Sequence, residues 1–232
     1  MTRVLILRCR EDAERTAREV AARGHQPLIL PTEEIVPLGS APPVRNVAGF
    51  IVTSANAVAP LAAAFPADPR PLLAVGETTA ARAREAGFAA IETGRGRAAD
   101  LVEQARELAQ AVGGPLLYAA GRVRRPDLET GLAERGTPVH VWEVYDTRPL
   151  RPDPAETAQA LGGGPPDAVL LLSAGQAEAY AWLAGEAASL FRPPPRLLCL
   201  SARIRDALPQ PMHAQALVSR VPRLFSLFDC FL

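Results

Sequence analysis

Three features of the sequence predict an α/β protein built from two similar parallel-sheet domains. Short apolar runs with strand character alternate with longer amphipathic stretches from the first residues onward. Such alternation is typical of parallel sheets whose two faces are covered by helices. The pattern occurs twice, and a length of 232 residues leaves room for two small domains.

The start of the chain shows the pattern most clearly. Val4–Leu7 is predicted to be a strand, and Asp12–Arg23 a helix whose small apolar residues share one face. Gly24 then ends the helix. By the same criteria, further strands are predicted at Leu28–Leu30, Phe50–Thr53, Leu72–Val75, Leu116–Ala119, Val139–Val141, Val169–Leu172 and Leu197–Leu200. Further helices are predicted at Ala55–Ala64, Thr78–Ala86, Ala98–Val112, Asp127–Arg135, Gln176–Ala184 and Ala202–Ala207.

An internal repeat indicates that one type of domain is used twice. Val4–Gly24 and Leu116–Gly136 match as a strand, a helix and a closing glycine, and we name this stretch repeat A. Phe50–Ala55 and Val169–Ala174 match as a strand that ends in Ser-Ala, and we name this stretch repeat B. The order along the chain is therefore A-B-A-B.

The residues leave open which repeat A shares a domain with which repeat B. One arrangement divides the chain near Gly113-Gly114, and the other lets the chain cross over after the first repeat A and return after the second. Two short extended segments, Glu34–Pro37 and Glu143–Thr147, follow the two A repeats. These segments are predicted to pair as a two-stranded connection if the chain crosses over.

Composition excludes several classes of function. The formal net charge is zero, from 25 basic and 25 acidic residues, which argues against a general nucleic-acid binder. The chain has no lysine, so Schiff-base chemistry is excluded, and arginine suits an anionic ligand, although genomic base composition also explains the bias. Apolar runs such as Ala168–Leu172 are too short for a membrane helix, and no signal-peptide pattern is present. We therefore expect a cytoplasmic protein.

The sequence predicts neither a metal site nor a nucleotide cofactor. Cys9, Cys199 and Cys230 lie far apart, and the three histidines form no metal-binding spacing. Gly94–Ala99 loosely resembles a dinucleotide fingerprint, but it lies outside the first βα unit and no acidic residue ends the next strand.

The turns between predicted strands and helices are the strongest candidates for a binding site. Ligands of open α/β sheets bind at the carboxyl ends of the strands, where helix N-termini favour anions. The alternative is that Ser54, Thr78 and Ser173 only cap their helices. We expect an anion-binding cleft between the two domains, lined by these turns. The candidate residues at the turns are Arg8, Thr53, Ser54, Gly76, Thr78, Thr79, Gly121 and Ser173.

The motifs at these turns, taken in order, resemble the uroporphyrinogen-III synthase family. Phe50–Val58 is close to the commonest signature of that family, and Ala74–Ala80 is similar to its Gly-x-Thr-Ala turn. Val144–Thr147 resembles its Val-Tyr-x-Thr segment, and Leu172–Gly175 its last serine-rich turn. The resemblance also covers Leu7-Arg8, Gly24, Pro31, Gly121, Arg125, Leu132 and Gly136. One departure is Ser201-Ala202, where the family carries a threonine-based turn.

The resemblance implies two flavodoxin-like domains joined by a two-stranded β-ladder. Residues 1–36 and 147–232 would form a discontinuous first domain, and residues 37–146 an inserted second domain. The two extended segments would then become the ladder. This favours the crossed-over arrangement of the repeats.

The resemblance also implies an activity. Members of the family cyclise linear hydroxymethylbilane to uroporphyrinogen III, with loss of water and inversion of ring D, in a lyase reaction without a cofactor. The substrate carries eight carboxylates, which suits a cleft with helix N-termini, hydroxyls and arginines. The alternative is a non-enzymatic two-domain α/β protein that binds a polycarboxylate ligand.

For individual residues, the resemblance points to Tyr145 as the catalytic proton donor, since it matches the tyrosine of the Val-Tyr motif. The alternative is a tyrosine that packs under the ladder with its hydroxyl satisfied locally. Arg125, Gly121 and Ser201 join the turn residues as expected substrate contacts. We further expect a monomer that receives its linear tetrapyrrole from hydroxymethylbilane synthase in a transient hand-over, without nucleic acid or membrane as a partner.

Overall fold

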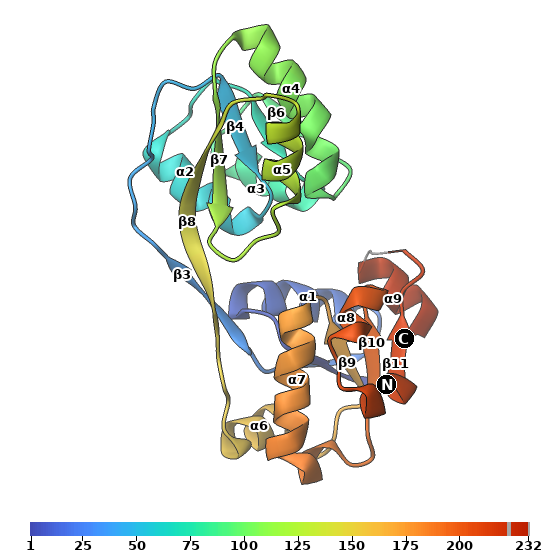
Figure 1. Ribbon diagram of the computed structural model, residues 1–232. Helices are drawn as coiled ribbons and strands as arrows, with labels where there is room; N and C mark the ends of the chain where they lie inside the picture. The colour runs from blue at the N-terminus through green and yellow to red at the C-terminus, as the bar shows by residue number, and fades with distance from the viewer. Residues whose placement is uncertain (222–223, 232) are drawn as a thin grey trace. The chain divides into compact units, whose positions relative to one another are not determined.

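The computed structural model describes residues 1–221 and 224–231, and the chain divides into two compact units (Figure 1). Met1–Glu34 and Arg148–Leu232 together form one unit, which we name the split unit. Ile35–Thr147 form the other, which we name the inserted unit. Each unit contains its own sheet and its own buried core.

A five-stranded parallel sheet forms the centre of the split unit. Its strands are β1 (Arg3–Ile6), β2 (Gln26–Ile29), β9 (Ala168–Leu171), β10 (Arg196–Cys199) and β11 (Ala216–Val218). The strand order is β11-β10-β9-β1-β2, so the N-terminal β1 pairs with β9 from the far end of the chain. The two chain segments of this unit therefore share one sheet.

Helices cover both faces of this sheet. They are α1 (Arg10–Ala22), α6 (Pro154–Leu161), α7 (Ala174–Glu186), α8 (Ala202–Asp206) and α9 (Leu224–Phe231), with 3₁₀ turns at Ala188–Phe191 and Gln210–Gln215. Val4 and Ile6 pack in the cluster that α1 and α9 cover, whereas Leu5 and Leu7 pack in the cluster of α6, α7 and α8. This alternation follows from the two-residue period of a strand.

The inserted unit has a six-stranded sheet. Its strands are β3 (Glu33–Pro37), β4 (Gly49–Val52), β5 (Leu72–Ala74), β6 (Ile91–Thr93), β7 (Leu116–Gly121) and β8 (Val139–Pro149). Its helices are α2 (Val58–Ala64), α3 (Glu77–Glu85), α4 (Leu101–Val112) and α5 (Asp127–Glu134), with 3₁₀ turns at Ala55–Ala57 and Ala98–Asp100. The order is β3-β8-β7-β4-β5-β6, and β8-β7-β4-β5-β6 are joined by parallel pairs.

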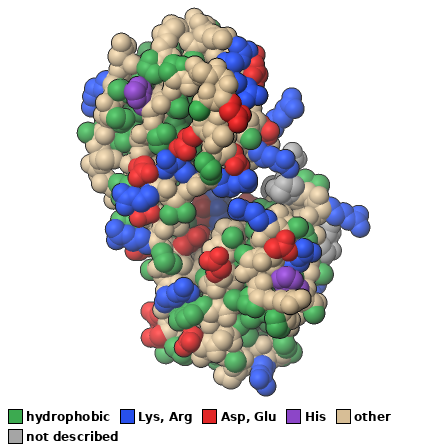
Figure 2. Space-filling view, viewed as in Figure 1, with side chains coloured by type: hydrophobic (Ala, Val, Ile, Leu, Met, Phe, Trp, Pro, Cys, Tyr) green, Lys and Arg blue, Asp and Glu red, His purple; other side chains and the backbone are tan. Residues whose placement is uncertain are grey.

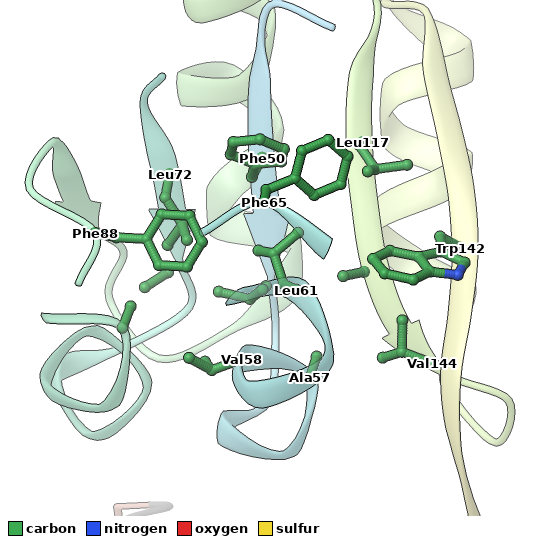
Figure 3. Close-up of a cluster of buried hydrophobic side chains, with 14 of the residues drawn as sticks. Phe50, Ala57, Val58, Leu61, Phe65, Leu72, Phe88, Leu117, Trp142 and Val144 are labelled. Atoms are coloured by element: carbon green, nitrogen blue, oxygen red, sulfur yellow. The ribbon is translucent and has the colours of Figure 1, made fainter. Parts of the chain in front are cut away.

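An aromatic cluster fills the side of this sheet that faces α2 and α3, as Figure 3 shows. Phe50 and Phe65 lie with ring centroids 5.0 Å apart, and Phe65 meets Trp142 edge to face at 6.4 Å. The indole nitrogen of Trp142 donates to Ser40, so its polar atom is satisfied although the ring is buried. On the other face, α4 and α5 cover a second cluster that contains Leu116 and the ring of Tyr118.

Both sheets have the same topology, which confirms the predicted fold class. Within the split unit, β1, β2, β9, β10 and β11 are arranged in space as 2-1-3-4-5, the flavodoxin-like order. In the inserted unit, the five strands β8, β7, β4, β5 and β6 show the same order when the count begins at β7. This unit is therefore a circular permutation of the other, with β3 added beside β8. The first repeat A thus pairs with the second repeat B, and β3 lies beside β8 as the predicted ladder.

The structure corrects some element predictions. Val139–Val141 and Glu143–Thr147 were expected as separate segments, but they form the single strand β8. The short edge strands β6 and β11 and the helices α6 and α9 were not predicted. For α6 a signal was present, because Asp153 and Glu156 form a capping box and Gly162 ends the helix with a φ of 58°. Each missed strand has three residues, too few to show a period.

Candidate functional site

The turn after β4 brings Thr53 and Ser54 to the carboxyl edge of the inserted sheet. The Thr53 hydroxyl lies 2.7 Å from the hydroxyl of Tyr118 on neighbouring β7. Ser54 has extended backbone, and its Oγ accepts a hydrogen bond from the amide of Asn56 at 3.2 Å. Ser54 is therefore a helix cap, and Thr53 is tied to a tyrosine that the sequence analysis did not single out.

Gly76 follows β5 in the turn that leads to α3. With φ −168° and ψ 174° this residue has ordinary extended backbone, so the turn does not need glycine for its conformation. A Cβ there would lie 3.6 Å from the Cα of Gly96, an ordinary contact. Gly76 is also the residue that precedes α3, so Thr78 lies within the helix and does not cap it. Thr78 is exposed, but Thr79 is buried with 5% of its surface exposed, so its side chain faces the interior.

The loop Gly94–Arg97 lies directly beside this turn. The amide of Gly96 donates to the carbonyl of Val75 at 2.8 Å, and the amide of Gly94 donates to the carbonyl of Ala74, also at 2.8 Å. Arg95 and Arg97 are exposed. The stretch that resembled a dinucleotide fingerprint is therefore a connection that carries two arginines to the start of α3.

Gly121 ends β7 under the ring of Tyr145. A Cβ on Gly121 would lie 2.6 Å from Cζ and 2.8 Å from the hydroxyl oxygen of Tyr145, so no larger residue fits without a shift. Tyr145 is buried, with 8% of its surface exposed, and it belongs to the aromatic cluster beside α2 and α3. Two predicted site residues are thus in contact.

A group of charged side chains after β7 was missed by the sequence analysis. Arg124 donates to Glu129 at 2.7 Å, to Glu143 at 2.9 Å and to the carbonyl of Gly121 at 3.0 Å. Hydrogen bonds from Arg124 and then Arg122 hold the pKa of the Glu143 carboxyl below its ordinary value. No local motif could have shown this group, since Glu143 lies 19 positions beyond Arg124.

The side chain of Arg125 is 65% exposed and pairs with Asp127 at 2.6 Å.

Tyr118 is 1% exposed. Burial raises the pKa of its phenol, an effect that the hydrogen bond with Thr53 partly offsets. The phenol of Tyr118 is therefore neutral at physiological pH. Its hydroxyl donates or accepts the hydrogen bond with Thr53.

In the split unit, Arg8 follows β1 at the carboxyl edge of the sheet, but its guanidinium is already engaged. It donates to Asp12 at 2.5 Å and to Thr16 at 3.1 Å, both on α1. Asp12 also pairs with Arg15 at 2.6 Å. A ligand carboxylate at Arg8 would therefore compete with Asp12.

Ser173 follows β9 and precedes α7, and Ser201 follows β10 and precedes α8. Ser173 caps α7, since its Oγ accepts from the amide of Gln176 at 3.1 Å. The buried side chain of Gln176 accepts from the amide of Leu172 and donates to Glu33, the first residue of β3. Ser201 has extended backbone and makes no cap hydrogen bond through its side chain, which leaves its hydroxyl for other contacts.

Within residues 1–221 and 224–231, no group of three or more His, Cys, Asp or Glu side chains is arranged to hold a metal ion. Cys9 and Cys199 are free and buried, and burial raises the pKa of both thiols, that of Cys199 to about 11. The side chain of Cys230 lies outside the described part of the chain.

The helices that the structure describes are too short or too polar to cross a membrane. Figure 2 shows basic and acidic side chains interspersed over the visible face of each unit.

The family model for uroporphyrinogen-III synthase HemD matches residues 14–229. The chain belongs to the uroporphyrinogen-III synthase family. No curated protein matches it in sequence. Among solved structures, the uroporphyrinogen-III synthetase of Helicobacter pylori has 15% identity and a TM-score of 0.63, covering 99% of this chain and 97% of that one. A variant of the uroporphyrinogen III synthase of Thermus thermophilus has 22% identity and a TM-score of 0.53, covering 100% and 97%.

The candidate residues that follow the strands lie at the carboxyl edges of the two sheets. In the inserted unit, Thr53, Gly76 and Gly121 follow or end the adjacent strands β4, β5 and β7. In the split unit, Arg8 and Ser173 follow the adjacent strands β1 and β9. In each unit, candidate residues from adjacent strands therefore lie at one edge of the sheet.

Proposed function

We propose that this chain converts hydroxymethylbilane to uroporphyrinogen III, with loss of water and inversion of ring D. The observation that carries the proposal is the family match over residues 14–229. The reaction is a carbon–oxygen lyase reaction with ring closure. It needs no electron acceptor, because the electron-rich pyrrole itself expels the hydroxyl.

The chemistry requires orientation above all. Loss of the hydroxyl leaves an azafulvene, and the substituted carbon of ring D attacks it to give a spiro intermediate, which fragments and recloses. In the absence of an enzyme the unsubstituted carbon closes the ring and gives the type I isomer. A protein that holds the chain in the folded conformation supplies catalysis by proximity and orientation.

The turns at the two carboxyl edges are proposed to hold the substrate carboxylates, largely through backbone amides. The first amides of α3 and α7 have no acceptor within their helices, and the helix dipole favours negative charge there. In this proposal Thr79 contributes its amide and not its buried hydroxyl, whereas the exposed Thr78 contributes both. Arg8 and Arg125 supply positive charge for the carboxylates. The remaining turn contacts come from Thr53, Ser54, Gly76, Gly121, Ser173 and Ser201.

Tyr145 is proposed to donate a proton to the departing hydroxyl. A phenol can act as a general acid, and Tyr145 lies against Gly121 at the carboxyl end of β7. Its 8% exposure also fits the alternative in which the ring only packs under the ladder. Substituting Tyr145 by Phe, which removes the hydroxyl and keeps the ring, separates the two.

The cellular setting is proposed on chemical grounds. Hydroxymethylbilane closes spontaneously to the wrong isomer, so we propose a monomer in the cytoplasm that takes the substrate in a transient hand-over from hydroxymethylbilane synthase. Size-exclusion chromatography with light scattering tests the monomer.

The activity is tested with purified protein and freshly prepared hydroxymethylbilane. Products are oxidised and the type I and type III isomers separated by chromatography. We expect type III as the main product with enzyme, and type I with buffer or heat-inactivated enzyme. If the product remains type I at high enzyme concentration, the proposal is wrong and the chain is a binding protein at most.

A further inference from the structure

The side chain of Tyr145 points to an unexpected face of its sheet. Along β8, Val139 and Val141 pack with the cluster beside α4 and α5, and Trp142 and Val144 with the cluster beside α2 and α3. Strict alternation would place Tyr145 with Val139 and Val141. It lies instead with Trp142 and Val144, so two consecutive side chains share one face.

A register shift explains this placement. Ala120 of β7 is the partner of Glu143, and the next residue, Gly121, is the partner of Tyr145. Val144 is therefore an extra residue, and β8 carries a bulge there. Bulges re-aim a side chain and are common next to active sites. Here the bulge turns Tyr145 across the end of β7, where the glycine leaves room for its ring.

Arg124 connects the two strands at this bulge. Its Nη1 donates to the carbonyl of Gly121 on β7 at 3.0 Å and to the carboxylate of Glu143 on β8 at 2.9 Å. Its Nε donates to Glu129 of α5 at 2.7 Å, which fixes the plane of the guanidinium. Only 22% of the Arg124 side chain is exposed, so these bonds are partly shielded from water. A separate backbone bond joins the amide of Arg122 to the carbonyl of Tyr145 at 2.8 Å.

The neighbouring arginine makes weaker contacts. Arg122 is 54% exposed and reaches Glu143 at 3.2 Å and Asp146 at 3.5 Å. Both of these carboxylates belong to β8. Arg124 thus ties Glu143, which precedes the bulge on β8, to Gly121, which is the β7 partner of Tyr145.

We propose that Arg124 is a positioning residue for Tyr145. By holding the carbonyl of Gly121 and the carboxylate of Glu143 together, it fixes the bulge and so the direction in which the phenol points. This rests on the proposed function in so far as Tyr145 is the proton donor. The guanidinium suits the task because its planar fork serves several acceptors at once, which an ammonium group cannot do in the same geometry.

The first experiment measures the position of Tyr145 without turnover. The chain has three tyrosines, so protein labelled with 3-fluorotyrosine gives three ¹⁹F resonances, which Tyr→Phe variants assign. We expect Arg124→Met to shift the Tyr145 resonance and to leave that of Tyr180, which packs against Phe191 in the split unit. Arg106→Met is the matched control, since it removes an arginine and its bond to Glu103 elsewhere in the same unit.

The second experiment measures kinetics in two backgrounds. Arg124→Met should lower kcat about tenfold with little change in KM, which is less than the roughly hundredfold that a 1 Å misplacement can cost. In a Tyr145→Phe background it should change kcat by less than about twofold, because residues that act together give non-additive effects. Arg106→Met should leave kcat unchanged in both backgrounds.

The outcomes separate the two proposals. An unchanged Tyr145 resonance in Arg124→Met, or the same loss of kcat in both backgrounds, overturns the positioning role. If Arg124→Met does not fold, the same two measurements are made on Arg124→Lys. Lysine keeps the positive charge but lacks the planar guanidinium that serves several acceptors at once. If the wild-type chain makes no type III isomer, the proposed function fails, and the ¹⁹F shift alone still decides whether Arg124 places Tyr145.

Discussion

The ring of Tyr145 packs against Gly121, and its hydroxyl is the proposed proton donor. Substituting Tyr145 by Phe keeps the ring over Gly121 and removes only the hydroxyl. We expect kcat to fall about a hundredfold, the lower end of what a general acid contributes, because this leaving group departs readily. KM should change little, since the lost interaction forms mainly in the transition state.

Tyr180→Phe is the control for this measurement, because it removes a buried phenol from the core of the split unit. The isomer assay with initial rates gives both constants. A Tyr145→Phe enzyme within a few-fold of wild type would establish that the ring only packs and that folding of the substrate dominates catalysis.

Gly121 gives a second prediction for a single residue. Alanine would place a Cβ 2.6 Å from the Tyr145 ring, so either the ring or β7 must move. We expect Gly121→Ala to lower the free energy of unfolding by roughly 1–3 kcal/mol, as overpacking does, and to reduce kcat. Urea unfolding measures the first effect.

Gly185 provides the matched control. It lies within α7, and a Cβ there meets nothing within 4 Å. Gly185→Ala should stabilise the chain by roughly 0.5–1 kcal/mol, since glycine is unfavourable inside a helix. Equal effects of the two substitutions would contradict the contact between Gly121 and Tyr145.

At the scale of elements, the connection between α2 and β5 is held by an ion pair over aromatic rings. Arg70 donates to both carboxylate oxygens of Asp68, at 2.9 and 2.6 Å, and to the carbonyl of Val47 at 3.1 Å. Its guanidinium lies 4.7 Å from the ring centroid of Phe50 and 5.3 Å from that of Phe65. The loop is thereby fixed to the core.

This pair predicts a pH dependence of stability. The hydrogen bond from Arg70 holds the pKa of Asp68 below its ordinary value. A carboxyl with a lowered folded-state pKa stabilises the fold above its unfolded-state pKa, and this contribution is lost as pH falls through the folded value. We expect Asp68→Asn to lower Tm at about pH 7 and to reduce the loss of Tm between about pH 5 and pH 3.

Thermal unfolding followed by circular dichroism over that range is the measurement. Asp206→Asn is the control, because the pair of Asp206 with Arg205 is largely exposed and such pairs contribute little. If Asp68→Asn retains the full acid sensitivity of wild type, the pair has no part in it.

At the scale of the whole molecule, the N-terminal segment must be held to a sheet whose other strands come mostly from the far end of the chain. The backbone amide of Arg3 donates to Asp167 at 2.7 Å, and its guanidinium donates to the carbonyls of Pro165, at 2.8 Å, and Leu161. Arg3 therefore links the two segments of the split unit at the amino edge of the sheet.

We expect Arg3→Met to destabilise the split unit by about 1–3 kcal/mol, because charged hydrogen bonds to partly buried carbonyls are lost. Hydrogen exchange should speed up in β1 and β9 and remain unchanged in the inserted unit. Arg18→Met, on the exposed side of α1, is the control. Faster exchange throughout both units would show that they unfold together, contrary to this prediction.

The sequence by itself determined the class of fold, the family and the turns that follow the strands. These features are local. A strand such as Val4–Leu7 is recognised from a short run of apolar residues, and Ser54 and Ser173 cap the helices that begin beside them. The crossed pairing of the repeats came from sequence only through the family resemblance. A pattern along the chain does not state which strands are neighbours in space.

Only the tertiary structure decided how the candidate residues are used. Arg8 is engaged by Asp12, Thr79 is buried, and the conformation of Gly76 does not require glycine. The bulge that re-aims Tyr145 lies next to the hydrogen bond between Arg124 and Glu143, which are 19 positions apart and meet because β7 and β8 are adjacent. Such contacts are set by the register between strands, which depends on packing across the whole sheet and not on the residues beside each position.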